Sequence, residues 1–215
     1  MRLKVPFRRY FHFAFPLHRL PQRPRIDGDL GDWPAFCRLP ELGEIDQEPA
    51  FAAVYAGWMP EGLGIALEVP GKTRVRVDQG KFWTGDCLEV WIDTAPAESK
   101  RQFDASCHHF YFLPRGGGRH GENGVAGRAF PASLARPPQR HLPDVEVASV
   151  VAPGHYTLEA FLPAHLLEGW PPVPGEVGFS YHLHDVQKGD QSFNLSKAFP
   201  LHADPSLWAT GHLVE

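Results

Sequence analysis

The sequence has little from which a disulfide framework, a membrane segment or a nucleic-acid interface could be built. Its three cysteines, Cys37, Cys87 and Cys107, form no C-x-x-C pair, so we expect reduced thiols. The net charge is only −4 at pH 7, which gives no electrostatic reason to expect nucleic acid or an anionic membrane as a partner. The basic N-terminal stretch is interrupted by charges, His and Pro. We therefore expect neither a signal peptide nor a transmembrane helix, and cytoplasmic location is the default.

Sequence motifs of several enzyme classes are also absent. "RGGGRHG" lacks the G-K-[ST] ending of a phosphate-binding loop, and neither H-E-x-x-H nor G-x-S-x-G occurs. "DGDLGD" begins like a calcium loop, but its twelfth position is Arg38. Glu89 and Asp93 lie about 13 Å apart along a strand, which is too far for either glycosidase mechanism. We therefore expect a protein without catalytic residues.

What the sequence does contain is alternation of apolar and polar residues in short runs separated by turns. In "CLEVWID", Leu88, Val90 and Ile92 alternate with Glu89 and other residues of the opposite face. The 22 prolines and 21 glycines fit many turns. These patterns predict an all-β fold of two antiparallel sheets packed as a jelly-roll β-sandwich. The expected strands are 51–58, 63–69, 87–93, 109–112, 144–151, 155–162, 178–185 and 207–214, with one or two more in the first twenty residues.

The connections show different turn chemistry. "VVAPGHYTLEAF" predicts a hairpin with Pro153 and Gly154 in its turn. One helical turn is expected at 163–167, with Pro163 in its first position. The Gly-rich residues 114–127 and the Pro-rich residues 131–143 are expected to be surface loops.

Histidines and aromatic residues suggest two kinds of site. His182 and His184 are two apart on one strand face, and Cys107, His108 and His109 are consecutive, so a metal site is one hypothesis. The other is a ligand platform. Trp83 stands just before a strand and could present its ring to a sugar, with polar partners on neighbouring strands. The candidate partners are Glu89, Tyr111, His182 and His184.

Five segments, in order, resemble the family 9 carbohydrate-binding modules, which are DOMON-like β-sandwiches. The segments are "RIDGDLGDWP", "FWTGDCLEVWIDT", "GHYTLEAFLPAHLL", "GEVGFSYHLHD" and "ADPSLWATGHLV". They cover most of residues 25–215, which we predict to be the sandwich, and residues 1–24 are predicted to be an extension packing on it. The resemblance implies a non-catalytic protein that binds a small sugar or glycan end, with a link to carbohydrate catabolism. It implies no cofactor, although a structural calcium ion is frequent in the family.

The resemblance also implies roles for particular residues. Trp83 takes the place of one clamp tryptophan, and Glu89, His182 and His184 take places of sugar-contacting groups. Tyr111 falls near an arginine contact, and Tyr111 or His109 is expected to line the floor of the site. The second clamp tryptophan is replaced by His202, with Phe199 nearby. The alternative is a His-rich metal-binding or structural interaction sandwich that has lost the sugar site, in which Trp83 would be buried and His184 bonded to protein groups.

Overall fold

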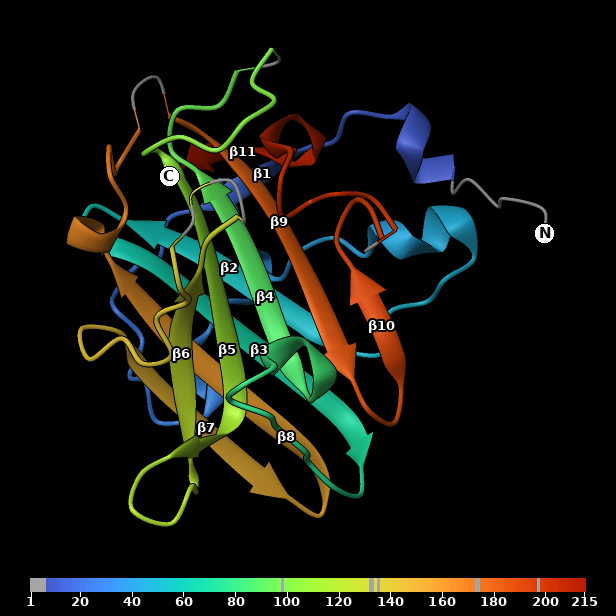
Figure 1. Cartoon of the computed structure of the whole chain (residues 1–215), viewed down its shortest axis with the longest axis vertical. Helices are drawn as coiled ribbons and strands as arrows, with labels where there is room; N and C mark the ends of the chain where they lie inside the picture. Colours follow the sequence, from blue (N-terminus) through green and yellow to red (C-terminus); the bar gives the residue numbers. More distant parts are fainter. Residues whose placement is uncertain (1–6, 98, 132–133, 135, 173–174, 197) are drawn as a thin grey trace.

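The computed structural model describes residues 7–97, 99–131, 134, 136–172, 175–196 and 198–215. Two β-sheets pack face to face (Figure 1), so the predicted two-sheet β-sandwich is confirmed. The first sheet has the order β1 (Ala14–His18), β11 (Ala209–Val214), β9 (Glu176–Asp185), β4 (Cys87–Asp93), β5 (Cys107–Gly117) and β6 (Asn123–Ala129), with β10 (Gly189–Ser192) also paired to β9. The second sheet has the order β2 (Ala53–Met59), β3 (Gly62–Lys72), β8 (Gly154–Pro163) and β7 (Glu146–Ala152).

Short 3-10 helices supply the helical turns among the described residues. They are η1 (Phe7–Tyr10), η2 (Leu30–Asp32), η3 (Ala35–Cys37), η4 (Leu42–Asp46), η5 (Phe82–Thr84), η7 (Ala164–Leu166) and η8 (Pro205–Leu207). The predicted turn at 163–167 forms as η7, but Pro163 is the residue before its first position. None of the helices in the described part of the chain has the length and apolar character needed to cross a bilayer.

The main core lies between the two sheets and follows the predicted alternation. Leu88, Val90 and Ile92 of β4 belong to it, together with Phe110 and Phe112 of β5. Successive side chains on a strand point to opposite faces, so the residues between them lie on the outer face of the first sheet. This outer face carries the candidate site residues of β4 and β5.

The predicted hairpin forms between β7 and β8. The two strands pair antiparallel, from Ala152 opposite His155 to Glu146 opposite Phe161. Gly154 has a φ of 92°, a conformation that glycine adopts without the penalty of a side chain.

The Gly-rich segment is more regular than the sequence indicated. Residues 114–127 were expected to be irregular, but β5 runs on to Gly117 and β6 begins at Asn123. Glycines carry no side chain, so this segment shows no alternation from which strands could be predicted. Residues 136–143 of the Pro-rich segment run back along β6, where Arg128 and Gln139 exchange two backbone hydrogen bonds of 2.8 Å. They thereby cover an edge strand.

A buried carboxylate joins two of the motifs that lie far apart in the sequence. Glu159 of β8 accepts hydrogen bonds from the backbone N–H groups of Asp27 and Gly28 and from the indole N–H of Trp33. Burial raises the pKa of Glu159. The "IDG" segment and the strand "YTLEAF" therefore form one structural unit.

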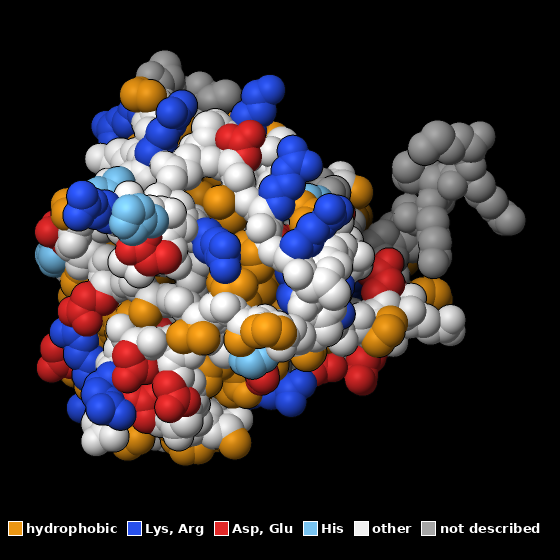
Figure 2. Space-filling view, turned by 90° about the horizontal axis from the view of Figure 1, so that it is seen from below, with side chains coloured by type: hydrophobic (Ala, Val, Ile, Leu, Met, Phe, Trp, Pro, Cys, Tyr) orange, Lys and Arg blue, Asp and Glu red, His pale blue; other side chains and the backbone are white. Residues whose placement is uncertain are grey.

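Charged side chains of both signs share the surface. Figure 2 shows one end of the molecule, with Lys and Arg mainly in the upper part of the view and Asp and Glu mainly at the lower left and right. Hydrophobic side chains are exposed between these charged groups. This end of the molecule therefore has no uniform field of one sign.

Candidate functional site

The outer face of the first sheet, across β9, β4 and β5, is hollowed into a cavity of about 650 Å³. The three strands lie side by side in Figure 1. Glu89 is opposite His182 on one side and Tyr111 on the other, and Trp91 is opposite His109. The cavity is lined by Phe82, Trp83, Glu89, Trp91, His109, Ala129, Phe130, Pro131, Pro138, His182, His184, Phe199, Leu201 and His202. Seven of the eight residues singled out from the sequence are thus brought together.

Trp83 lies on η5, which packs on the outer face of the sheet. Its neighbour Phe82 is buried and stacks on Tyr111, with ring centroids 4.0 Å apart and planes within 3°. Trp83 meets Phe82 edge to face at 5.0 Å and keeps 53% of its surface exposed. The structure therefore places Trp83 as an exposed wall of the cavity.

Tyr111 is the one candidate residue that does not line the cavity. It is buried between Phe82 and Gly127. A Cβ atom on Gly127 would lie 2.1 Å from Cζ of Tyr111, so the tyrosine ring lies flat against bare backbone. Tyr111 therefore supports η5 through its contact with Phe82. A stacked aromatic pair contributes about 0.5–1.5 kcal/mol to stability beyond the effect of its buried area.

Replacing Gly127 with alanine is expected to disturb this support. The new methyl group has to displace the Tyr111 ring, and overpacking of this kind costs about 1–3 kcal/mol. Urea denaturation should show that loss of unfolding free energy. Gly31→Ala is the matched control, because its Cβ would meet only the Asp29 side chain, at 3.2 Å. Equal stability of Gly127→Ala and the parent protein would contradict the proposed packing.

Glu89 and His109 form the polar centre of the cavity. Nε2 of His109 lies 2.8 Å from Oε2 of Glu89, and the imidazole stacks on Trp91 at 4.6 Å between centroids. Glu89 has only this one hydrogen-bonded oxygen among the described residues. Its other oxygen, Oε1, is available as an acceptor.

His182 and His184 are held by residues of β10. Nδ1 of His182 is 2.8 Å from Oγ of Ser192, and its Nε2 is 3.3 Å from Oδ1 of Asp190. Nδ1 of His184 is 2.7 Å from the same Asp190 oxygen. An ionised carboxylate can only accept, so Nδ1 of His184 donates this hydrogen bond, which in a singly protonated ring leaves Nε2 as an acceptor. Among the described residues nothing is bonded to this Nε2.

Phe199, Leu201 and His202 line the cavity from the segment that follows β10. His202 is exposed, and Phe199 is half-buried. The guanidinium of Arg9 lies 5.7 Å from the centroid of the Phe199 ring. The position expected to hold a second clamp tryptophan therefore borders the cavity, but with an imidazole.

Several lining residues were not singled out from the sequence. Phe82 is adjacent to Trp83 in the chain, and Trp91 shares the outer face with Glu89, so position alone could have pointed to both. Pro131 and Pro138 come from a segment expected to be a surface loop, and Phe130 directly precedes it. No sequence signal indicated that this segment folds back over the sheet.

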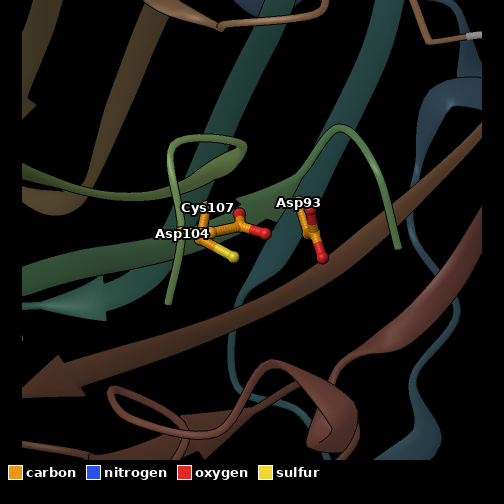
Figure 3. Close-up of side chains that lie close together, drawn as sticks. All are labelled: Asp93, Asp104 and Cys107. Carbon is orange, nitrogen blue, oxygen red and sulfur yellow. The ribbon is translucent and has the colours of Figure 1, made fainter. Parts of the chain in front are cut away.

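Metal binding finds little support in the described residues. His108 and His109 point to opposite faces of β5 and cannot share an ion. His108 is buried on the core side, and burial together with the charge of Arg128 lowers its pKa to about 4. Among the described residues, the group of three that lies close enough together to hold an ion is Asp93, Asp104 and Cys107 (Figure 3).

A cation of the protein already lies beside these carboxylates. Nζ of Lys100 is 2.9 Å from Asp93 and 3.1 Å from Asp104. Burial raises the pKa of the Cys107 thiol to about 12, so it keeps its proton and is a poor ligand. Calcium requires six to eight oxygen ligands. The residues present do not fit such an ion.

The fold is that of a carbohydrate-binding-module β-sandwich, and more narrowly that of the family 9 modules. Two similar structures are the family 9 module from Caldicellulosiruptor kristjanssonii with cellotriose (14% identity, TM-score 0.65, 93% of each chain) and the same module with glucose (13%, 0.64, 94% of this chain and 95% of that one). A third is a candidate carbohydrate-binding protein from Bacteroides uniformis ATCC 8492 (12%, 0.58, 95% and 100%). No family model and no curated protein matches the sequence. At these identities the likeness concerns the fold.

Proposed function

We propose that this protein is a non-catalytic sugar-binding module whose ligand lies in the cavity on β9, β4 and β5. The observation that carries the proposal is the exposed ring of Trp83 on the wall of a cavity that also contains Glu89. A pyranose has an apolar C–H face that can pack on an indole, and hydroxyl groups that need polar partners. The solved family 9 modules hold glucose and cellotriose, which supports the same class of ligand. A role in carbohydrate catabolism is part of this proposal.

The available polar atoms suit hydroxyl groups. Oε1 of Glu89 and Nε2 of His184 are both acceptors, and a hydroxyl donates one hydrogen bond and accepts others. His109, Phe199 and His202 would complete the wall around the ring. Hydrogen bonds to a charged carboxylate are about twice as strong as neutral ones. Glu89 is therefore proposed as the main hydroxyl partner.

The absence of catalysis is part of the proposal. Glycoside hydrolysis needs two carboxylates on either side of the bond that is broken. Glu89 is the one carboxylate among the described residues that line the cavity, and His109 is bonded to it.

A structural module without a ligand is the second candidate. The bond between His184 and Asp190 favours it. The exposure of Trp83 disfavours it, because a purely structural tryptophan is normally covered. Isothermal titration calorimetry against mono- and oligosaccharides tests the choice. We expect binding of at least one sugar, and no heat with any sugar at millimolar concentration would contradict the proposal.

Replacing Glu89 with glutamine is expected to weaken sugar binding about tenfold, because a charge-assisted hydrogen bond becomes a neutral one. Titration of both proteins with the best-bound sugar measures the change. Glu68→Gln is the matched control, since Glu68 is an exposed glutamate on β3 outside the cavity. If Glu89→Gln binds the sugar as tightly as the parent protein does, Glu89 does not bond to the sugar.

A further inference from the structure

The cavity has two chemically different sides. The polar groups come from three adjacent strands: His182 and His184 from β9, Glu89 from β4 and His109 from β5. On the β6 side the described lining residues have no polar side-chain atoms: Ala129, Phe130, Pro131 and Pro138. A ligand that fills the cavity therefore meets hydroxyl partners on one side and an apolar wall on the other.

The apolar wall is held in place by the sheet. The backbone of Arg128 and Gln139 is hydrogen-bonded in both directions, and the N–H of Leu142 donates to the carbonyl of Ala126 at 3.1 Å. The guanidinium groups of Arg128 and Arg136 lie 5.4 and 5.9 Å from the centre of the Phe130 ring. Proline rings add stiffness. Contacts within the protein thus hold the wall in place.

A further sugar ring is a poor match for this wall. Its hydroxyl groups would be shielded from water by Ala129, Phe130 and the prolines without gaining partners from them, which is unfavourable. A flat apolar group loses no hydrogen bonds there and can pack on the Phe130 and proline rings. A cavity of about 650 Å³ also lies in the range of ligands larger than a single sugar.

We propose, resting on the proposed function, that the ligand is a glycoside with an aromatic aglycone. The sugar ring packs on Trp83 and bonds to Glu89 and His184. The aglycone lies against Phe130, Pro131 and Pro138.

Calorimetry with methyl and para-nitrophenyl glycosides of glucose, galactose and xylose tests this inference. The para-nitrophenyl glycoside of the bound sugar should bind about tenfold more tightly than its methyl glycoside. In Phe130→Ala the ratio between the affinities for the para-nitrophenyl and methyl glycosides should fall to about one. Pro138→Ala, at an exposed position, should reduce the same advantage without affecting folding. Phe36→Ala is the control, because Phe36 is exposed and does not line the cavity.

The outcomes separate the two proposals. Methyl glycoside binding with no gain from the aryl group, or a gain that persists in both Phe130→Ala and Pro138→Ala, overturns the aglycone assignment and leaves sugar binding standing. If a hexyl glycoside gains as much affinity over the methyl glycoside as the para-nitrophenyl glycoside does, the aglycone need not be aromatic and that part of the proposal is wrong. Binding of none of the glycosides overturns the proposed function as well.

Discussion

Trp83→Ala is expected to weaken sugar binding about 30-fold or more while leaving the fold intact. Removal of a central aromatic contact in a binding site typically costs at least about 2 kcal/mol, which corresponds to that factor. Trp83 has 53% of its surface exposed, and its described ring contact is one edge of Phe82. The change in unfolding free energy should therefore stay within about 0.5 kcal/mol.

Calorimetric titration and urea denaturation of the same variant measure the two effects. Phe36→Ala is the matched control, because Phe36 is 54% exposed and lies outside the cavity. If Trp83→Ala binds sugar as the parent protein does, the ligand does not pack on this ring, and the proposed site is wrong.

Lys72→Met is expected to cause the largest loss of stability, about 3–5 kcal/mol. Lys72, at the end of β3, is only 2% exposed, and its Nζ lies 2.9 Å from Asp86 and 2.8 Å from Asp185. Without the ammonium, two buried carboxylates face each other unpaired. Asp86 also accepts hydrogen bonds from the N–H groups of Arg76 and Val186. The loss would therefore loosen the segment that carries η5.

Thermal unfolding should show a decrease of about 6–20 °C in Tm for Lys72→Met. Lys188→Met is the control, because Lys188 is exposed. Adding Asp86→Asn and Asp185→Asn to Lys72→Met should restore part of the loss, since the unpaired charges are then removed. A decrease in Tm as small as that of the control would show that the buried ions are not coupled.

Alternation of residues was enough to predict which way the strands face. It placed Leu88, Val90 and Ile92 inward and Glu89 outward, and both hold in the structure. The same alternation does not predict which strands are adjacent, because it carries no information about which strand pairs with β4. The polar partners of Trp83 are expected on neighbouring strands of one sheet, and β5 and β9 do flank β4.

Contacts between loops and the sheet could not be predicted from the pattern. Tyr111 lies on the expected face, but the stacked ring of Phe82 covers it. Phe130 and Pro138 reach the cavity through hydrogen bonds between Arg128 and Gln139. Such contacts depend on where a loop returns in space, which single-residue preferences do not encode. The boundary predicted at residue 25 rests on the family resemblance. β1 precedes that boundary, and its pairing with β11 could not be predicted from the residue pattern.

The first strand has a practical consequence for anyone who shortens the chain. β1 runs parallel to β11, so Ala14–His18 protects one side of the C-terminal strand. Phe15 and Leu17 are also part of the main core. A chain that starts at residue 25 would expose the backbone of β11 as an open edge, where a second copy could add its own strand. Self-association of such a fragment would then reflect the cut, and the intact chain is the form in which ligand affinity should be measured.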